Sequence, residues 1–294
     1  MNIIEQAARR LEELRRSGVE VPQRGSPGGH RVAKDRGDER AAVPLSDAGS
    51  TSKRVEIDLN RLMALGYLTP NNSRSQLASE FRVIKRPLLM NVHGQSAAPV
   101  DRANLVMVTS SLPGEGKTFV SLNVAISISM ELDCQVLLVD ADVSRPAVLQ
   151  RLGLPPAPGL LDLLTNPQLR MSDVLLRTNI DRLSLLPAGS AQAHATELLA
   201  SENMRTLLEQ MATRYSDRVI LFDAPPLLPS TESRVLATRM GQVLVVVEAD
   251  QTSHGTVAEA MATLESCPVV LPVLNKTSRS EVGSYYGSYG HVGV

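Results

Sequence analysis

The sequence predicts an α/β fold built on a mostly parallel, twisted β-sheet with helices on both faces. Short apolar, β-branched runs recur between residues 104 and 276, and stretches with helical periodicity separate them. Several of these runs are almost continuously apolar, which is typical of strands buried on both faces of a parallel sheet. A glycine-rich segment joins the first apolar run to the first helical stretch, which is a common entry to a nucleotide site.

The predicted strands and helices alternate in order along this region. The predicted strands are 105–109, 135–139, 183–186, 218–222, 242–247 and 269–274. The clearest helices between them are 118–130, 201–215 and 255–265.

The rest of the chain divides into shorter segments around the main domain, 104–276. Residues 1–21 contain an amphipathic helix, which either packs on its own chain or docks a partner. Residues 22–54 are rich in breakers and charges and predict a flexible linker. Residues 55–103 predict a helical extension, with a short helix ending at Gly66 and a second over 75–86 that Pro87 closes. Residues 277–294 predict a disordered tail.

Composition excludes several classes of protein. The formal net charge is −1 and the pI is about 6.5, so no generally basic, nucleic-acid-binding surface is indicated. Cys134 and Cys267 lie far apart without CxxC spacing, which predicts two buried thiols in a reducing compartment. No apolar run approaches the length of a membrane-spanning helix, so any membrane association is expected to come through a partner.

The strongest motif is the loop that runs from Ser111 to Thr118, between the first strand and the first helix. Gly114 and Gly116 let backbone N–H groups curl around phosphate oxygens, and the helix directs its positive end at the same anion. Lys117 can reach the β- and γ-phosphates, and the Thr118 hydroxyl can bind Mg²⁺. Ser111 stands where such P-loops usually have their first glycine. The predicted nucleotide contacts are Pro113, Gly114, Glu115, Gly116, Lys117, Thr118, Phe119 and Asn275, the last either a base contact or a satisfied loop amide.

Carboxylates follow two of the other predicted strands. Asp140 and Asp142 end the second strand, and Asp223 ends the strand at 218–222. Ligands of open α/β sheets bind at the carboxyl ends of strands, so these side chains are expected to face Mg²⁺ and the γ-phosphate. The alternative for the first pair is that one of them caps the helix that begins near Pro146.

Three of the five tyrosines of the chain, Tyr285, Tyr286 and Tyr289, lie in the last ten residues among glycines and serines. Core packing does not explain aromatic residues in such a segment. They predict a phosphoacceptor cluster, with a sticky tail or a binding strand for another subunit as the alternatives.

Together these motifs resemble the bacterial tyrosine kinase family that controls exopolysaccharide synthesis, and most closely the tyrosine autokinases associated with exosortase and PEP-CTERM systems. The resemblance rests on the loop at 110–118, on 139–142 with Arg145-Pro146, on 221–226, on 197–201 and on the tyrosine tail. It implies a P-loop ATP-binding kinase domain over 104–276 that uses ATP and Mg²⁺ and phosphorylates its own tail.

The resemblance also implies roles for individual residues. Lys117, Asp140 and Asp142 match the catalytic set, with Asp140 activating the tyrosine hydroxyl. The matched Mg²⁺ ligands are Thr118, Asp140 and Asp223. Glu80, Arg82 and Lys85 match a family motif that makes contacts between subunits of a ring-shaped oligomer. Lys85 stands where that motif ends in arginine. A second departure is Ser144, where the family often has arginine.

The resemblance further implies partners and a location. These are a membrane-embedded protein that determines polysaccharide chain length and activates the kinase, further copies of the chain, and an opposing tyrosine phosphatase. The chain is then expected to be cytoplasmic and peripheral to the inner membrane. The alternatives are a nucleotide-switched ATPase like MinD and ParA, or an ATP-binding regulator of a polysaccharide synthesis complex with little turnover. Against the first alternative, positions 111–115 lack the additional lysine of those ATPases.

Overall fold

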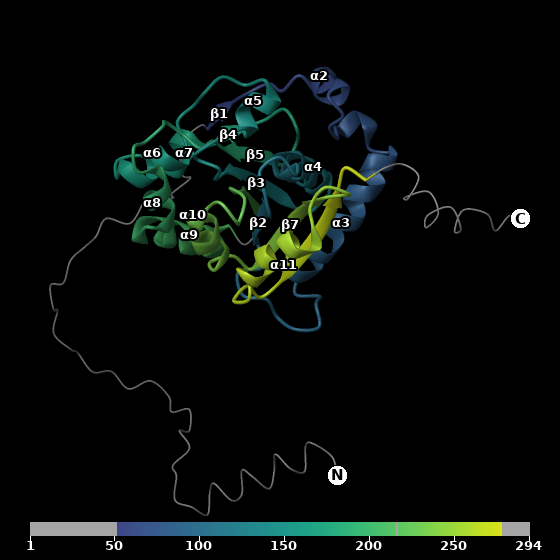
Figure 1. Ribbon diagram of the computed structural model, residues 1–294. Helices are drawn as coiled ribbons and strands as arrows, with labels where there is room; N and C mark the ends of the chain where they lie inside the picture. Colours follow the sequence, from purple (N-terminus) through teal and green to yellow (C-terminus); the bar gives the residue numbers. More distant parts are fainter. Residues whose placement is uncertain (1–51, 216, 278–294) are drawn as a thin grey trace, which may run out of the picture. The chain divides into compact units, whose positions relative to one another are not determined.

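The computed structural model of the chain describes residues 52–215 and 217–277 (Figure 1). Three segments predicted from the sequence lie outside these residues: the N-terminal helix, nearly all of the linker, and the tyrosine tail except its first residue. Within them, no helix is both long enough and apolar enough to cross a membrane.

The elements alternate as the sequence predicts. The strands are β1 (Lys53–Arg54), β2 (Leu105–Ser110), β3 (Gln135–Asp140), β4 (Leu176–Arg177), β5 (Leu183–Leu186), β6 (Arg218–Asp223), β7 (Gln242–Glu248) and β8 (Val270–Asn275). The helices are α2 (Leu59–Ala64), the 3₁₀ helix η1 (Pro70–Asn72), α3 (Gln76–Val92), α4 (Lys117–Ser129), α5 (Val148–Leu152), α6 (Leu160–Thr165), α7 (Met171–Val174), α8 (Ala195–Ala200), α9 (Glu202–Arg214), α10 (Thr231–Ala237) and α11 (His254–Ala262).

One eight-stranded sheet forms the centre, in the order β1-β4-β5-β3-β6-β2-β7-β8. Every neighbouring pair is parallel except β4 and β5, which run antiparallel. The predicted mostly parallel sheet is therefore confirmed. All six predicted strands are present, and the two-residue strands β1 and β4 add the edge that the sequence did not predict.

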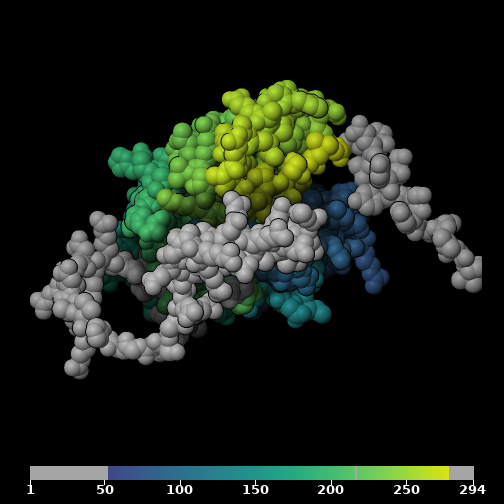
Figure 2. Space-filling view, turned by 90° about the horizontal axis from the view of Figure 1, so that it is seen from below, coloured from purple at the N-terminus to yellow at the C-terminus, as the bar shows by residue number. Residues whose placement is uncertain are grey.

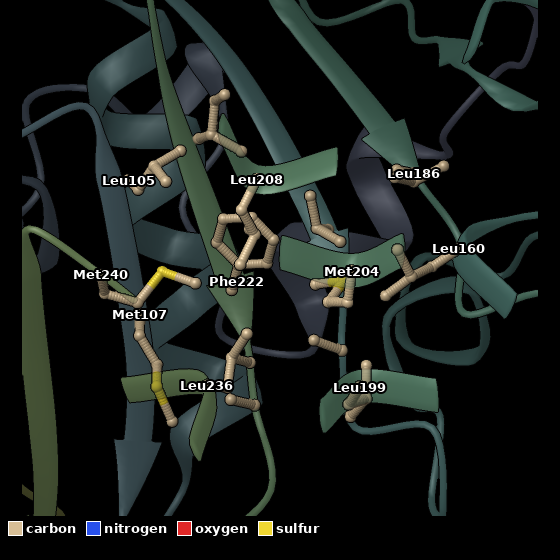
Figure 3. Close-up of a cluster of buried hydrophobic side chains, with 14 of the residues drawn as sticks. Leu105, Met107, Leu160, Leu186, Leu199, Met204, Leu208, Phe222, Leu236 and Met240 are labelled. Carbon is tan, nitrogen blue, oxygen red and sulfur yellow. The ribbon is translucent and has the colours of Figure 1, made fainter. Parts of the chain in front are cut away.

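Two apolar layers cover the two faces of the sheet. On one face, Met107 and Phe222 pack under α6 to α11 (Figure 3). On the other, the alternate residues Val106 and Leu221 pack under α2 to α5. Successive side chains of a strand point to opposite faces, so β2 is buried along its whole length. The strand that leads into the P-loop is therefore packed on both faces.

The helical extension lies beside the C-terminal strands. Gln242 on β7 donates from Nε2 to the backbone oxygen of Leu88 on α3, and its Oε1 accepts from Asn91 Nδ2 at 2.7 Å. Figure 2 shows the blue extension next to the yellow C-terminal segment. These contacts attach α3 to the start of β7, the strand that pairs with the P-loop strand β2.

The prediction that Pro87 ends the second helix is wrong, because α3 continues to Val92. Phe81 and Leu88 are both buried on the sheet side, so packing on each side of the proline supports one continuous helix. Pro87 faces solvent, where water can bind the Val83 carbonyl that the proline leaves without its helical donor.

Candidate functional site

The P-loop lies between β2 and the first turn of α4. Gly114 and Gly116 have left-handed φ angles of +94° and +99°. A Cβ on Gly116 would lie 2.1 Å from Nδ2 of Asn275, so both its backbone angle and its surroundings require glycine. Ser111 is fully buried and is not among the described residues with positive φ. A side chain is therefore tolerated where a glycine is usual.

The end of β8 holds the loop from the side. Asn275 donates from Nδ2 to the backbone oxygen of Glu115 at 2.8 Å, and Lys276 donates from Nζ to that of Gly114 at 2.9 Å. Lys276 also pairs with Glu248 on β7 at 2.9 Å. The predicted base contact Asn275 thus binds the loop itself, and its next neighbour does the same.

The Glu115 side chain connects the P-loop to itself and to the residues at and after the end of β7. Its buried carboxylate accepts from the backbone N–H groups of Leu112, at 2.7 Å, and Glu248, and from the hydroxyl of Thr252. Three donors on one buried carboxylate satisfy it and restrict the loop to one shape. Sequence reasoning gave Glu115 only a nucleotide contact and missed Glu248, Thr252 and Lys276, because nothing in their local sequence marks them.

Lys117 lies among the carboxylates. Its Nζ is 2.7 Å from Asp142 Oδ2 and 3.9 Å from Asp223 Oδ1. The Thr118 hydroxyl donates to the other oxygen of Asp223 at 2.7 Å, and Ser121 donates to Oδ1 at 3.0 Å. Four of the predicted site residues therefore meet at the carboxyl ends of the strands, and Ser121 joins them without having been predicted.

Burial and charge oppose one another at this cluster. Burial disfavours the charge of Lys117, but Asp223, Asp142 and Asp140 together outweigh it and raise the pKa of the lysine. The pKa of the fully buried Asp223 is also raised, because desolvation exceeds the effects of Lys117, Thr118 and Ser121. The lysine is thus held as a cation facing a surplus of acidic groups.

Asp140 has a different environment from its neighbours. Its Oδ2 accepts from the N–H groups of Ala147 and Val148 at 3.1 and 3.0 Å, so it caps α5. Its buried Oδ1 has no hydrogen-bond partner among the described residues. Desolvation, with Asp223 as the next cause, raises the pKa of Asp140 to about 7. The capping alternative left open by the sequence therefore applies to one of its two oxygens.

Two cavities flank the P-loop, and both touch Gly114 and Lys117. The first has a volume of about 630 Å³ and includes Thr118, Phe119 and Asn275 in its wall. Its wall also includes Leu65, Tyr67, Arg151 and Lys276. The second, of about 480 Å³, includes Asp142. Asp140 lines neither of them and borders a third cavity of about 390 Å³ instead.

The three residues matched to subunit contacts lie together on α3 but differ in exposure. Glu80 accepts from Gln76, and Arg82 donates to the backbone oxygen of Ser73. Lys85 is buried, pairs with Glu131 at 2.6 Å and donates to the backbone oxygen of Ser127. The Lys85 side chain therefore attaches α3 to α4 within one chain, and its matched role in contacts between subunits stays a prediction.

Comparison with known proteins places this geometry in context. The family model described as AAA domain matches residues 104–269. EpsB of Ralstonia nicotianae is 32% identical over 263 residues, which is 86% of this chain and 33% of EpsB. The chain therefore spans about a third of the length of EpsB from Ralstonia nicotianae and from Ralstonia solanacearum.

Other relatives carry more specific names. Tyrosine-protein kinase YwqD of Bacillus subtilis is 30% identical, over 66% of this chain and 81% of YwqD. The succinoglycan biosynthesis transport protein ExoP of Rhizobium meliloti is 26% identical, over 84% of this chain and 31% of ExoP. The crystal structure of the VpsO kinase domain has a TM-score of 0.58 and 30% identity, and covers 71% of this chain and all of the domain.

Proposed function

The chain belongs to the bacterial tyrosine-protein kinase family, and we propose that it transfers the γ-phosphate of ATP to tyrosines in its own C-terminal tail. The observation that carries the proposal is the position of Lys117, between the P-loop glycines and the carboxylates Asp142 and Asp223. A mobile cation at this point neutralises the charge that develops on a transferred phosphoryl group.

The residues present fit a divalent cation. Three carboxyl groups face one ammonium group, and a buried oxygen of Asp140 has no partner among the described residues. Thr118 and Asp223 would hold Mg²⁺, and Asp140 would add negative charge from the adjacent strand. Within the described residues no three side chains form a ready metal cage, which suits an ion bound by few protein ligands and by phosphates. When bound, Mg²⁺ would offset the charge of the β- and γ-phosphates.

We assign the proton-accepting role to Asp142 in place of Asp140. Asp142 borders the cavity beside Lys117, whereas Asp140 borders neither cavity at the loop and already caps α5. In the ligand-free chain Asp142 is paired with Lys117. Phosphate oxygens that bind Lys117 would release Asp142 Oδ2 to accept the phenolic proton of the acceptor.

The predicted acceptors Tyr285, Tyr286 and Tyr289 remain part of the proposal. Their sequence neighbours are glycines and serines, which favour a flexible segment that can bring a phenol group to an active site. The wider role is regulation of exopolysaccharide synthesis or export, supported by the name of ExoP and by the family resemblance. A cytoplasmic location, an activating membrane protein, an opposing phosphatase, assembly into a homo-oligomer and the narrower exosortase-associated class belong to the same proposal.

The test is tandem mass spectrometry of the purified chain after incubation with Mg-ATP, beside a Lys117→Ala variant. Phosphate on one or more of the tail tyrosines is expected, and it should be absent from the variant. An Arg86→Ala variant, changed at an exposed residue of α3, controls for handling and should match the unmodified chain. An unmodified tail despite ATP hydrolysis would favour the nucleotide-switched ATPase.

A further inference from the structure

The cavity beside Asp142 has an unusual wall. Besides Gly114, Lys117 and Asp142, its lining includes four prolines: Pro113, Pro225, Pro226 and Pro229. A proline ring is apolar and rigid, and it offers a flat face to an aromatic ring without losing rotamer freedom. The lining thus combines groups that act in phosphoryl transfer with apolar proline surfaces.

The segment that carries three of these prolines is fixed in place. The backbone oxygen of Pro225 accepts from Thr109 at 2.6 Å and from Ser233 at 2.7 Å. Arg234 donates to the backbone oxygens of the two residues that follow Pro226, at 2.9 and 2.8 Å. The wall is therefore formed before any ligand binds, which lowers the entropic cost of binding.

In-line transfer assigns the two cavities to different reactants. The attacking and leaving oxygens of a phosphoryl transfer lie on opposite sides of the phosphorus. Both cavities touch Gly114 and Lys117, but only the larger includes Thr118, Phe119 and Asn275, from α4 and the end of β8. With the nucleoside in the larger cavity, the leaving ADP would lie there, and an in-line acceptor would have to enter from the cavity with the prolines.

Polar side chains also line the proline cavity. They are Ser144, Arg145, Thr196, Ser230 and Glu232. The Arg145 side chain makes no hydrogen bond or ion pair with the described residues, and it is exposed. Hydrogen bonds from its own N–H, Ser230 and Thr231 lower the pKa of Glu232, so this carboxyl is an anion. These polar groups can bind the backbone of an acceptor peptide.

We propose that this cavity is the acceptor subsite, and that its proline wall selects tyrosine over serine and threonine. The inference rests on the proposed kinase function. The phenolic oxygen forms a bond to the γ-phosphorus, the bond from that phosphorus to the ADP oxygen breaks, and the phenolic proton passes to Asp142. An aromatic ring can pack on the prolines while its hydroxyl reaches Lys117 and Asp142. A serine side chain has no ring to pack on them.

The test measures steady-state kinetics with a synthetic acceptor peptide of residues 282–291. The enzyme is the full chain with Tyr285, Tyr286 and Tyr289 changed to phenylalanine, so that its own tail does not compete. In this background Thr196→Phe fills the cavity from α8, away from the P-loop. We expect KM for the peptide to rise at least tenfold, while KM for ATP stays within twofold. Pro229→Ala should raise the peptide KM a few-fold.

Matched controls decide between outcomes. Thr213→Phe makes the same change on an exposed position of α9 and should leave both KM values unaltered. A peptide with serines in place of the tyrosines should not be phosphorylated. The subsite is refuted if Thr196→Phe leaves the peptide KM unchanged, or raises the KM for ATP instead. Absence of peptide phosphorylation by the parent enzyme would count against the kinase function itself, and the inference would fall with it.

Discussion

At the scale of single residues, the two P-loop glycines, Gly114 and Gly116, allow backbone strain to be separated from steric conflict. Both have left-handed φ angles, but only Gly116 faces a close neighbour, Asn275, while a Cβ on Gly114 meets nothing within 4 Å. We predict that Gly116→Ala weakens nucleotide binding at least tenfold, because it adds a steric conflict to the backbone strain. Gly114→Ala adds only the strain, about 1 kcal/mol, and should weaken binding a few-fold.

Isothermal titration calorimetry with an unhydrolysable ATP analogue measures both glycine variants. Circular dichroism should show that both remain folded. Equal losses for the two variants would contradict a role for the approach of Asn275 to the loop.

Asp140 predicts a pH effect of definite sign. Its pKa is about 7 in the folded chain against an ordinary value of 3.8, so between these pH values the folded state keeps a proton that the unfolded state loses. The free energy of unfolding of the ligand-free chain should therefore fall as pH rises from about 4 to about 7 and stay low above that. The cost at higher pH is at most on the order of 4 kcal/mol.

Asp140→Asn should remove this cost and still accept from Ala147 and Val148. Urea unfolding without nucleotide or metal is expected to show a gain in stability about 2 kcal/mol larger at pH 8 than at pH 5. Ser144→Ala, at an exposed position nearby, is the control. A gain of the same size at both pH values would refute the buried titration.

At the scale of elements, α3 carries an internal proline at a solvent-facing position. A proline within a helix costs about 3 kcal/mol relative to alanine, and relaxation around the Val83 carbonyl recovers part of it. We predict that Pro87→Ala raises the free energy of unfolding by about 1 to 3 kcal/mol. Arg86→Ala, one residue earlier and also exposed, should change it by less than about 0.5 kcal/mol.

Chemical denaturation with parallel fluorescence and circular dichroism measurements tests the α3 prediction. A destabilised Pro87→Ala variant would mean that the proline is needed for the contacts of Leu88 and Asn91 with Gln242.

At the scale of the whole molecule, charge on the tail should control assembly. Each phosphate adds about −1.5 to −2 charges at pH 7, so three phosphotyrosines turn a nearly neutral chain into a clearly acidic one. We predict that the fully phosphorylated chain forms smaller assemblies than the unphosphorylated chain, because the tails repel one another and the acidic sites.

Light scattering after size-exclusion chromatography at low salt compares the two forms. Added salt should reduce the difference, since screening weakens repulsion between exposed charges. The same size distribution for both forms at low salt would refute the prediction.

The motifs in the sequence were sufficient to predict the α/β fold class and most of the residues that meet at the site. The P-loop, the apolar strands and the carboxylates at their ends are local patterns, and parallel strands bring their carboxyl ends to one edge of a sheet. Lys117, Thr118, Asp142 and Asp223 could therefore be predicted to meet. The edge strands β1 and β4 could not, because two residues carry no periodic signal and form only against a partner strand.

Only the tertiary structure decided which carboxylate does what. Asp140 and Asp142 are two residues apart and look equivalent in the sequence, yet one caps α5 and the other pairs with Lys117. Other contacts also join segments that are far apart along the chain. They are the hydrogen bond from Thr252 to Glu115, the ion pair of the buried Lys85 and the lining of the proline cavity. A sequence pattern specifies how each segment folds locally, whereas the contacts between segments depend on packing that no single segment contains.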